Sequence, residues 1–344
     1  MNQKLQTYME VGAPCSLPLG LVCIEAGGTR KMCLLGVAVQ HPPMHLLGFA
    51  RRTAQVTGAR ADLATVYAHR FRAYHQLSKL TDIEIELATP AYMGLGSDGV
   101  LGLSVARLLA AMHNLPTETA ALVSALGLEP RHALSIAAFD RGGLVLLDLG
   151  VPPGVVPPVV QRYEIAHPEK EAWAFVFYLP RVSNHTPPTL EDQHTNALFQ
   201  AAPFLEDNTE AGAQLATAVQ QNDVALFAQA LTLVRQQTEA ALLRAGHGVV
   251  LSEEAQQVLA VMQEMGAVAW GRNFGGLGLY GLIEGAHPSR LMRYRLRQQF
   301  GAHGGWIMAT ITDNRGGVHM QKNSAPSISA ARYELQVGAK GEGR

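Results

Sequence analysis

The 344-residue sequence carries little charge, and its positive and negative charges nearly cancel. Charged side chains make up 16% of the residues, and 27 Lys and Arg stand against 28 Asp and Glu. No run of five Lys or Arg occurs, so the basic patch that marks a nucleic-acid-binding sequence is missing. We therefore expect no nucleic-acid partner.

Cysteine and long apolar runs are also scarce. Cys15, Cys23 and Cys33 form no CxxC pair and have no histidine at metal-binding spacing, which predicts reduced thiols in a core. No apolar stretch of about 20 residues is free of charge and proline, so no membrane-spanning helix is expected. Met1–Val11 lacks the basic end and apolar run of a secretory signal. These absences predict a cytoplasmic protein without a membrane partner.

The sequence does contain enough apolar residues for a large core. Hydrophobic residues make up 48%, and 344 residues suit two packed domains better than one. A polar stretch at His167–Lys170, followed by a dense apolar run, places the boundary there. We predict an N-terminal domain over 1–168, a C-terminal domain over 169–320 and a weakly patterned tail over 321–344.

Local patterns predict an antiparallel sheet at the start of the chain, then mixed helices and strands. The predicted strands are Met9–Cys15, Leu19–Ile24, Met32–Gln40, His45–Arg51, Asp82–Leu87 and Gly143–Leu149. Helices are predicted over Ala61–Lys79 and Val100–His113, with further helical segments to about Phe139.

The second half is predicted to be α+β, with its helices separated from an antiparallel sheet. Its predicted strands are Trp173–Leu179, Ala267–Trp270, Leu277–Ile283 and Gly305–Thr312. Its predicted helices are Leu190–Ala201, Ala211–Gln220, Val224–Ala245, Glu253–Met265 and Ser289–Phe300. The chain as a whole is expected to be an α/β protein.

A glycine-rich turn, Pro90-Ala-Tyr-Met-Gly-Leu-Gly-Ser-Asp-Gly99, precedes the apolar helix Val100–His113. Glycines before a buried helix leave backbone N–H groups free beside the positive end of the helix dipole, and together these bind anions. We expect a phosphate there.

Other interpretations of the turn are open. It could be a tight connection that binds nothing, because glycine turns are common in α/β proteins. It could be a dinucleotide fingerprint, but the strand and acidic residue that should follow are replaced by a helical stretch over Thr117–Leu126. A P-loop is excluded, because no GxxxxGK[ST] occurs.

The segment Pro90-x-x-x-Gly94-Leu-Gly96-Ser97 resembles the motif with which the GHMP kinase superfamily holds nucleotide phosphates. Gly271-Arg-Asn-Phe-Gly-Gly-Leu-Gly-Leu-Tyr-Gly281 lies between two predicted strands, where the superfamily has its C-terminal glycine motif. The resemblance implies a two-domain GHMP fold with the site between the domains. The N-terminal domain would be ribosomal-protein-S5-like and the C-terminal domain ferredoxin-like.

A third segment, Phe139-Asp-Arg-Gly-Gly143, is similar to the Phe-Glu-x-Gly-Gly segment of β-ribofuranosylaminobenzene 5′-phosphate synthases of methanopterin biosynthesis. The resemblance covers roughly Gly12 to Asp313. It implies a transferase that joins phosphoribosyl diphosphate to an aromatic acid and releases carbon dioxide and diphosphate. The alternative is a GHMP kinase that transfers the γ-phosphoryl group of ATP to a small molecule.

Two departures from the family pattern bear on function. Where the branch usually has an Arg-Leu-His-Leu-Gly-like run, this chain has Ala13-Pro-Cys-Ser-Leu-Pro-Leu-Gly20. Asp98 stands where the kinases commonly have a second serine. It could share a Mg²⁺ with phosphate, or it could be a favourable charge in the first turn of a helix. Pro18 and Asp98 make a catalytically silent ligand-binding protein a third alternative.

Candidate roles follow from the resemblance and from residue chemistry. Ser97 and Asp98 are candidate ligands of Mg²⁺, with ATP or phosphoribosyl diphosphate as the substrate. Arg141 and Arg272 adjoin glycines that let a ligand approach, so each is either a cation for the leaving diphosphate or a surface charge. The expected phosphate-binding residues are Gly94, Leu95, Gly96, Ser97, Asp98, Gly99, Arg272, Gly275 and Gly276.

The loop from Arg181 to His194 collects ionisable groups directly after a predicted strand, as functional loops do. His185 or His194 could be a general acid or base, and Asp192 a base or metal ligand. The spacing Thr189-x-x-Asp192 is alternatively that of a helix cap. The candidate catalytic residues are Asp192, His185 and Arg141.

Arg290, Arg293 and Arg297 fall on one face of a predicted helix. Such a stripe is usually solvated. It could also bind a phosphate or a partner subunit, which leaves a homodimer open.

Overall fold

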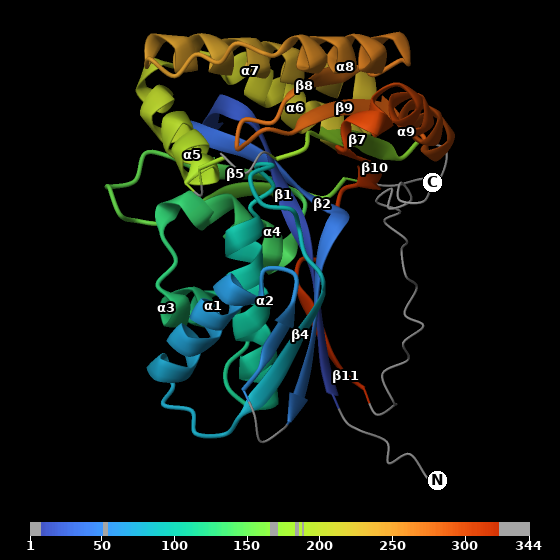
Figure 1. The fold of residues 1–344 in the computed structure, drawn as a ribbon. Helices are drawn as coiled ribbons and strands as arrows, with labels where there is room; N and C mark the ends of the chain where they lie inside the picture. Colours follow the sequence, from blue (N-terminus) through green and yellow to red (C-terminus); the bar gives the residue numbers. More distant parts are fainter. Residues whose placement is uncertain (1–7, 51–53, 166–170, 183–185, 188, 323–344) are drawn as a thin grey trace, which may run out of the picture.

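The structure is a computed structural model that describes residues 8–50, 54–165, 171–182, 186–187 and 189–322. These residues form two β-sheets covered by helices (Figure 1). The larger sheet runs along the molecule, and the smaller one lies near one end with α7 and α8 over it. Among the described residues, no helix combines the length and the apolarity that crossing a membrane requires.

Two long strands dominate the larger, seven-stranded sheet. β1 (Tyr8–Ala26) and β2 (Thr29–Ala50) form one antiparallel hairpin around the Gly27–Gly28 turn. The prediction of four short strands here is wrong. β1 continues through its interruptions by shifting register between Ala13 and Cys15 and between Pro18 and Gly20, and such bulges accommodate proline within a ladder.

The remaining strands of this sheet pair with different parts of the hairpin. The order is β11-β1-β2-β4-β3, and β5 pairs with β2 and with β6. The sequence did not predict β11, a strand of five residues that are mostly exposed. The bounds are β3 (Val56–Gly58), β4 (Thr81–Leu87), β5 (Leu144–Asp148), β6 (Val159–Tyr163) and β11 (Val318–Lys322).

Four helices cover one part of this sheet. The central one, α2, is buried on nearly every side, as its apolar sequence predicts. Its side chains share a core with α1, α3 and the sheet residues Val11, Leu46 and Ile83. The bounds are α1 (Ala61–Tyr74), α2 (Ser97–Met112), α3 (Thr119–Leu126) and α4 (Ala133–Arg141).

The smaller sheet is antiparallel, with the order β10-β7-β9-β8. Its strands are β7 (Trp173–Leu179), β8 (Ala269–Arg272), β9 (Leu279–Glu284) and β10 (Trp306–Ile311). The accompanying helices are α5 (Leu190–Ala201), α6 (Thr209–Gln221), α7 (Val224–Arg244), α8 (Glu253–Glu264) and α9 (Ala286–Phe300). Leu17 and Val22 of β1 share one core with Phe175 and Phe227, so apolar residues of both predicted domains pack together. The domain boundaries stay a prediction.

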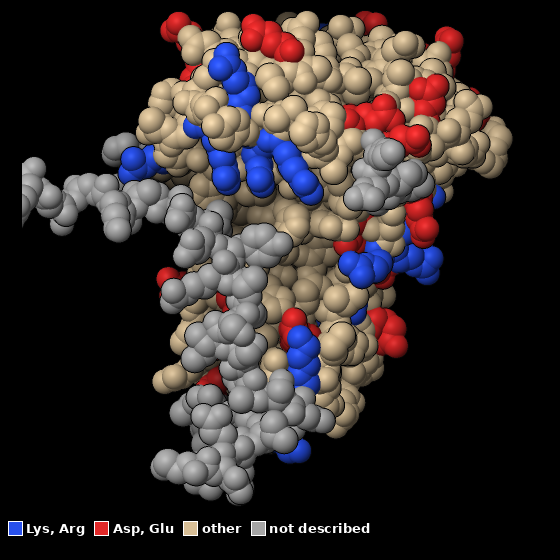
Figure 2. Space-filling model, turned by 90° about the vertical axis from the view of Figure 1, so that its right-hand side faces the viewer, with Lys and Arg blue, Asp and Glu red and all other residues tan. Residues whose placement is uncertain are grey.

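The arginines of α9 lie on the surface. Arg290 and Arg297 are exposed, and both lower the pKa of Arg293 after the larger effect of its burial. Figure 2 shows the face of the molecule that lies on the right-hand side of Figure 1, and several Lys and Arg side chains lie side by side in its upper part. A role for the stripe beyond solvation stays a prediction.

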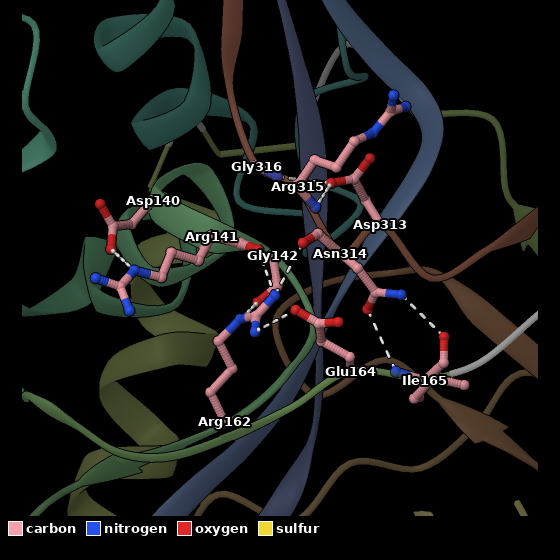
Figure 3. Close-up of polar contacts among 10 residues, drawn as sticks. All are labelled: Asp140, Arg141, Gly142, Arg162, Glu164, Ile165, Asp313, Asn314, Arg315 and Gly316. Carbon is pink, nitrogen blue, oxygen red and sulfur yellow. Dashed lines mark hydrogen bonds and ion pairs between the residues drawn. The ribbon is translucent and has the colours of Figure 1, made fainter.

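The Phe139–Gly143 segment forms a tight corner between α4 and β5. Gly142 and Gly143 have φ of 64° and 86°, a left-handed region that favours glycine. The Gly143 N–H donates to the Asp313 carbonyl at 2.6 Å, and the Asp313 carboxylate accepts from the Gly316 N–H at 2.7 Å. The glycines thus let two distant parts of the chain meet (Figure 3).

Arg162 of β6 joins these two parts, and we expect Arg162→Ala to lower the free energy of unfolding by about 3 kcal/mol. Its guanidinium donates to the carbonyls of Gly142 at 2.9 Å, Arg141 at 2.8 Å and Asn314 at 2.9 Å, and three carbonyls would lose a charged donor (Figure 3). Urea unfolding would measure the loss. Arg295→Ala, on the exposed face of α9, is the control at about 0.5 kcal/mol or less. Equal losses would contradict the bridging role.

Candidate functional site

The glycine turn between β4 and α2 forms the candidate site, and we call its residues Gly94–Gly99 the cradle. Tyr92, Gly94 and Gly96 have φ of 67°, 74° and 67°, so the chain winds through left-handed conformations before the helix starts. Gly96 is the N-cap of α2 and supplies no side-chain cap. The first-turn N–H groups of α2 therefore receive no side-chain cap from Gly96 and lie at the positive end of the helix dipole.

The larger sheet and α4 hold the turn on two sides. The Ser16 N–H of β1 donates to the Leu95 carbonyl at 3.1 Å. The Ser135 hydroxyl of α4 donates to the Gly96 carbonyl at 3.1 Å. A cradle fixed by β1 and α4 does not need the ligand to order it, which reduces the entropy cost of binding.

The second glycine motif packs directly on the first. Asn273 donates from Nδ2 to the carbonyls of Met93 at 2.7 Å and Gly94 at 3.0 Å. A Cβ on Gly94 would come within 3.0 Å of the backbone of Gly275 and Gly276. The structure therefore brings the two predicted glycine motifs together, while the role of Gly275 and Gly276 in phosphate binding stays a prediction.

A carboxylate of the chain itself lies in the cradle. Glu191, in the first turn of α5, accepts from the Gly94 N–H at 2.8 Å and from the Ser97 hydroxyl at 3.1 Å. The pKa of Glu191 is raised to about 7, first by burial and then by the negative charge of Asp98, against the lowering effect of these two hydrogen bonds. The cradle thus already binds one oxyanion, through the groups predicted to hold phosphate.

Asp98 is paired with a cation that the sequence did not predict. Arg60, directly before α1, forms an ion pair with its carboxylate. The Ser97 hydroxyl also lies 3.2 Å from the Asp98 carboxylate, between it and Glu191. The two candidate Mg²⁺ ligands, Ser97 and Asp98, therefore both place side-chain oxygen atoms in the cradle. Among the described residues, no group of three or more His, Cys, Asp or Glu side chains is placed to hold a metal ion by itself.

A second ion pair lines the same cavity. Arg131 lies 3.2 Å from the carboxylate of Asp192, whose pKa is raised by burial and lowered by that arginine. Burial and Arg131 lower the pKa of His132 beside it. With Asp98 and Glu191, these residues surround a cavity of about 50 Å³, room for about three waters. A phosphate group therefore needs Glu191 to move.

The other predicted residues lie elsewhere. Arg141 is 78% exposed and pairs with Asp140 at 3.6 Å (Figure 3). It does not line this cavity. Arg272 does not line it either. His185 lies outside the described residues. Their proposed roles in catalysis and phosphate binding stay predictions.

The helix-cap interpretation of Thr189-x-x-Asp192 is wrong. Thr189 precedes α5 but makes no side-chain cap bond, and its hydroxyl instead accepts from Gln193 at 3.1 Å. Asp192 pairs with Arg131 rather than with first-turn N–H groups. The tertiary contact is available because α5 lies against the 3-10 turn Pro130–His132, which contains Arg131 and precedes α4.

A larger apolar pocket lies on the other side of the turn. It measures about 370 Å³, and Tyr92, Leu179, Val182 and Trp306 form much of its wall. Arg60 borders this pocket and also pairs with Asp98 in the cradle. A ligand with an apolar ring and a phosphate group could therefore occupy both.

No protein-family model and no curated protein sequence matches the chain. Solved structures do. The chain is similar to homoserine kinase from Cytophaga hutchinsonii, with a TM-score of 0.61 and 16% identity over 91% of this chain and 97% of that one. It is also similar to mevalonate diphosphate decarboxylase from Staphylococcus aureus, with a TM-score of 0.59 and 14% identity over 93% and 99%.

A third similar structure is mevalonate-3-kinase from Thermoplasma acidophilum, with a TM-score of 0.55 and 14% identity over 92% of this chain and 99% of that one. The likeness to these three structures confirms the predicted fold. At these identities the likeness is one of fold, so function must be argued from the site.

Proposed function

We propose that the chain is a cytoplasmic transferase that binds the diphosphate group of a small-molecule substrate at Gly94–Gly99. The observation that carries this is the Glu191 carboxylate in the cradle, held by the Gly94 N–H and the Ser97 hydroxyl. Backbone and hydroxyl donors that hold one oxyanion can hold another. Substrate would replace Glu191 there.

Phosphoribosyl diphosphate is the substrate that the surrounding charges favour. Loss of diphosphate leaves positive charge on the ribosyl carbon, and fixed negative charges aimed at developing positive charge lower such a barrier. Asp98 and Asp192 line the small cavity beside the cradle and would stay there when the diphosphate replaces Glu191. Together with the resemblance to β-ribofuranosylaminobenzene 5′-phosphate synthases, this supports joining the ribosyl group to an aromatic acid. The ring would lie in the apolar pocket by Tyr92 and Trp306.

Mg²⁺ fits the cradle as a companion of the diphosphate. Mg²⁺ is usually held by one or two carboxylates together with substrate phosphates and water, not by a cage of protein ligands. The Ser97 hydroxyl and the carboxylate of Asp98 offer oxygen donors of this kind. Bound there, the ion would neutralise charge on the leaving diphosphate. The chain's own part is to orient that group with the N–H groups of α2.

An ATP-dependent kinase is the second candidate, favoured by the apolar pocket beside the cradle. A nucleobase could fill its volume of about 370 Å³, with the phosphates at Gly94–Gly99 and Arg60 between them. Homoserine kinase and mevalonate-3-kinase are both similar in fold. In this case the pocket would hold adenine rather than an aromatic acid.

Thermal unfolding with either ligand separates the two functions. At about 100 times its Kd, a ligand adds about 2.7 kcal/mol to the free energy of unfolding. We expect this shift with phosphoribosyl diphosphate and Mg²⁺, and a much smaller one after Ser97→Ala. A shift with ATP and Mg²⁺ alone would replace the synthase by the kinase. No shift with either ligand would favour the catalytically silent alternative.

A further inference from the structure

Two adjoining clefts open on the other side of α5, between the α7–α8 connection and strands β8 and β9. One measures about 250 Å³ and the other about 360 Å³. Arg272, Val249 and Val250 line both, and we call the joined clefts the Arg272 groove. None of the residues that line the groove also lines the cavity of the glycine turn.

Arg272, the buried cation on the floor of the groove, is only partly neutralised by its ion-pair partner. Arg272 is 8% exposed, and its guanidinium lies 4.8 Å from the centre of the Phe274 ring. Its ion-pair partner is Glu239, at 3.8 Å, and Arg235 shares the same carboxylate at 3.6 Å. Two guanidiniums thus share one carboxylate that is itself 46% exposed. A buried guanidinium that shares its carboxylate with a second guanidinium is stabilised by a further anion.

The acids at the groove do not meet this need. Glu254 lines the smaller cleft but is engaged by the Tyr178 hydroxyl and by His303 at 3.0 Å. His194 faces the same cleft, and burial and the charge of Arg272 lower its pKa. The buried Nδ1 of His194 has no hydrogen-bond partner among the described residues. His194 therefore adds no anion beside Arg272.

The rim of the groove is apolar although it faces solvent. Val250 is 93% exposed, and Val249 and Leu243 beside it are also exposed. Exposed apolar side chains gathered at a cleft are a feature of binding sites. A small inorganic anion would not cover them, whereas an anion with an apolar body would.

We propose that the Arg272 groove is a second binding site, specific for an organic carboxylate with an apolar body. Arg272 pairs with the carboxylate, and Val249, Val250 and Leu243 cover the body. The site is independent of the transferase function proposed for the glycine turn.

Calorimetric titration with octanoate and with benzoate tests the site. We expect saturable binding of one or both, with a Kd below about 1 mM, and at least about tenfold weaker binding of octanol, benzyl alcohol and inorganic phosphate. Absence of saturable binding by both acids would overturn the proposal. Binding should persist in the presence of saturating phosphoribosyl diphosphate, which distinguishes this site from the glycine turn. Displacement by that compound would also overturn it.

Two variants locate the binding. Arg272→Met removes the charge while keeping the stem, and Val250→Asp places a negative charge on an exposed side chain whose change should leave folding intact. Each should weaken carboxylate binding about tenfold or more, which is about 1.4 kcal/mol. Arg290→Met on α9, which removes an equal charge elsewhere, should leave binding unchanged. Full binding by Val250→Asp, or an equal loss in Arg290→Met, would overturn the assignment even if Arg272→Met failed to fold.

Discussion

A Gly94→Ala variant is expected to lose about 4 kcal/mol of the free energy of unfolding, and the cradle with it. Gly94 has φ of 74°, where a Cβ costs about 1–2 kcal/mol. The added Cβ would also come within 3.0 Å of the backbone of Gly275 and Gly276, and overpacking of this kind costs about 1–3 kcal/mol. Backbone cannot turn aside as a flexible side chain can, so the two glycine motifs would separate.

Gly28→Ala is the matched control. Gly28 has the same φ of 74°, but nothing lies within 4 Å of the position that its Cβ would take. Gly28→Ala should lower the free energy of unfolding by about 1 kcal/mol, which is the conformational cost alone. Urea unfolding of both variants measures the difference. If the two losses are equal, the contact between the glycine motifs contributes nothing to stability.

Replacing Glu191 by Gln should strengthen the binding of phosphoribosyl diphosphate about tenfold at pH 8. There the Glu191 carboxylate, with a pKa of about 7, is ionised and repels an incoming phosphate. In the unmodified protein, affinity should rise as the pH falls below about 7, because Glu191 takes up a proton. The Glu191→Gln variant should lack this rise in affinity. Calorimetric titration of both proteins at pH 6 and pH 8 measures the contribution of Glu191. The ionisation of the ligand affects both proteins equally, so the difference between them comes from residue 191.

The same group makes stability depend on pH. The folded-state pKa of Glu191 lies above its ordinary value of 4.5, so the folded protein holds a proton that the unfolded chain releases between pH 4.5 and 7. Stability from this group is therefore greatest below pH 4.5 and falls by on the order of 3 kcal/mol as the pH rises through about 7. Glu191→Gln should remove that fall, whereas Glu210→Gln, on the exposed face of α6, should keep it. Identical pH profiles in all three proteins would contradict the burial of Glu191 in the cradle.

Elements with a strong local signal could be predicted from the sequence. The dense apolar run Trp173–Leu179 is β7, and the predicted helix Leu190–Ala201 is α5. The apolar helix after the glycine turn is α2, although it starts at Ser97, three residues earlier than predicted. In each case the periodicity or apolar density of the segment itself determines the element.

Elements that depend on distant pairing could not be predicted as well. β1 and β2 read as four strands, because a bulge looks like an interruption until the partner strand shows that the ladder continues. β11 is a strand because Val318–Lys322 pairs with Tyr8–Gly12. Its own five residues are mostly exposed, so burial does not mark it as a strand.

The candidate site likewise has a part that could be predicted from the sequence and a part that could not. The backbone donors at Gly94–Gly99 are local to one turn, so the sequence could identify them. Glu191 reaches the turn from 97 residues further along the chain, and Arg60 reaches Asp98 from 38 residues before it. No spacing rule connects such pairs. The glycine neighbours of Arg272 predict a cation for phosphate, a role that stays a prediction, and no local pattern predicts that Arg272 lines the Arg272 groove.

A crystal structure obtained with Mg²⁺ and diphosphate tests the central claim most directly. The cradle should hold the diphosphate on the Gly94 N–H, the Ser97 hydroxyl and the first-turn N–H groups of α2, with the Glu191 side chain displaced from its present hydrogen bonds. Glu191 still bound to Gly94, with diphosphate elsewhere or absent at saturating concentration, would contradict the assignment of this turn as the substrate's phosphate site.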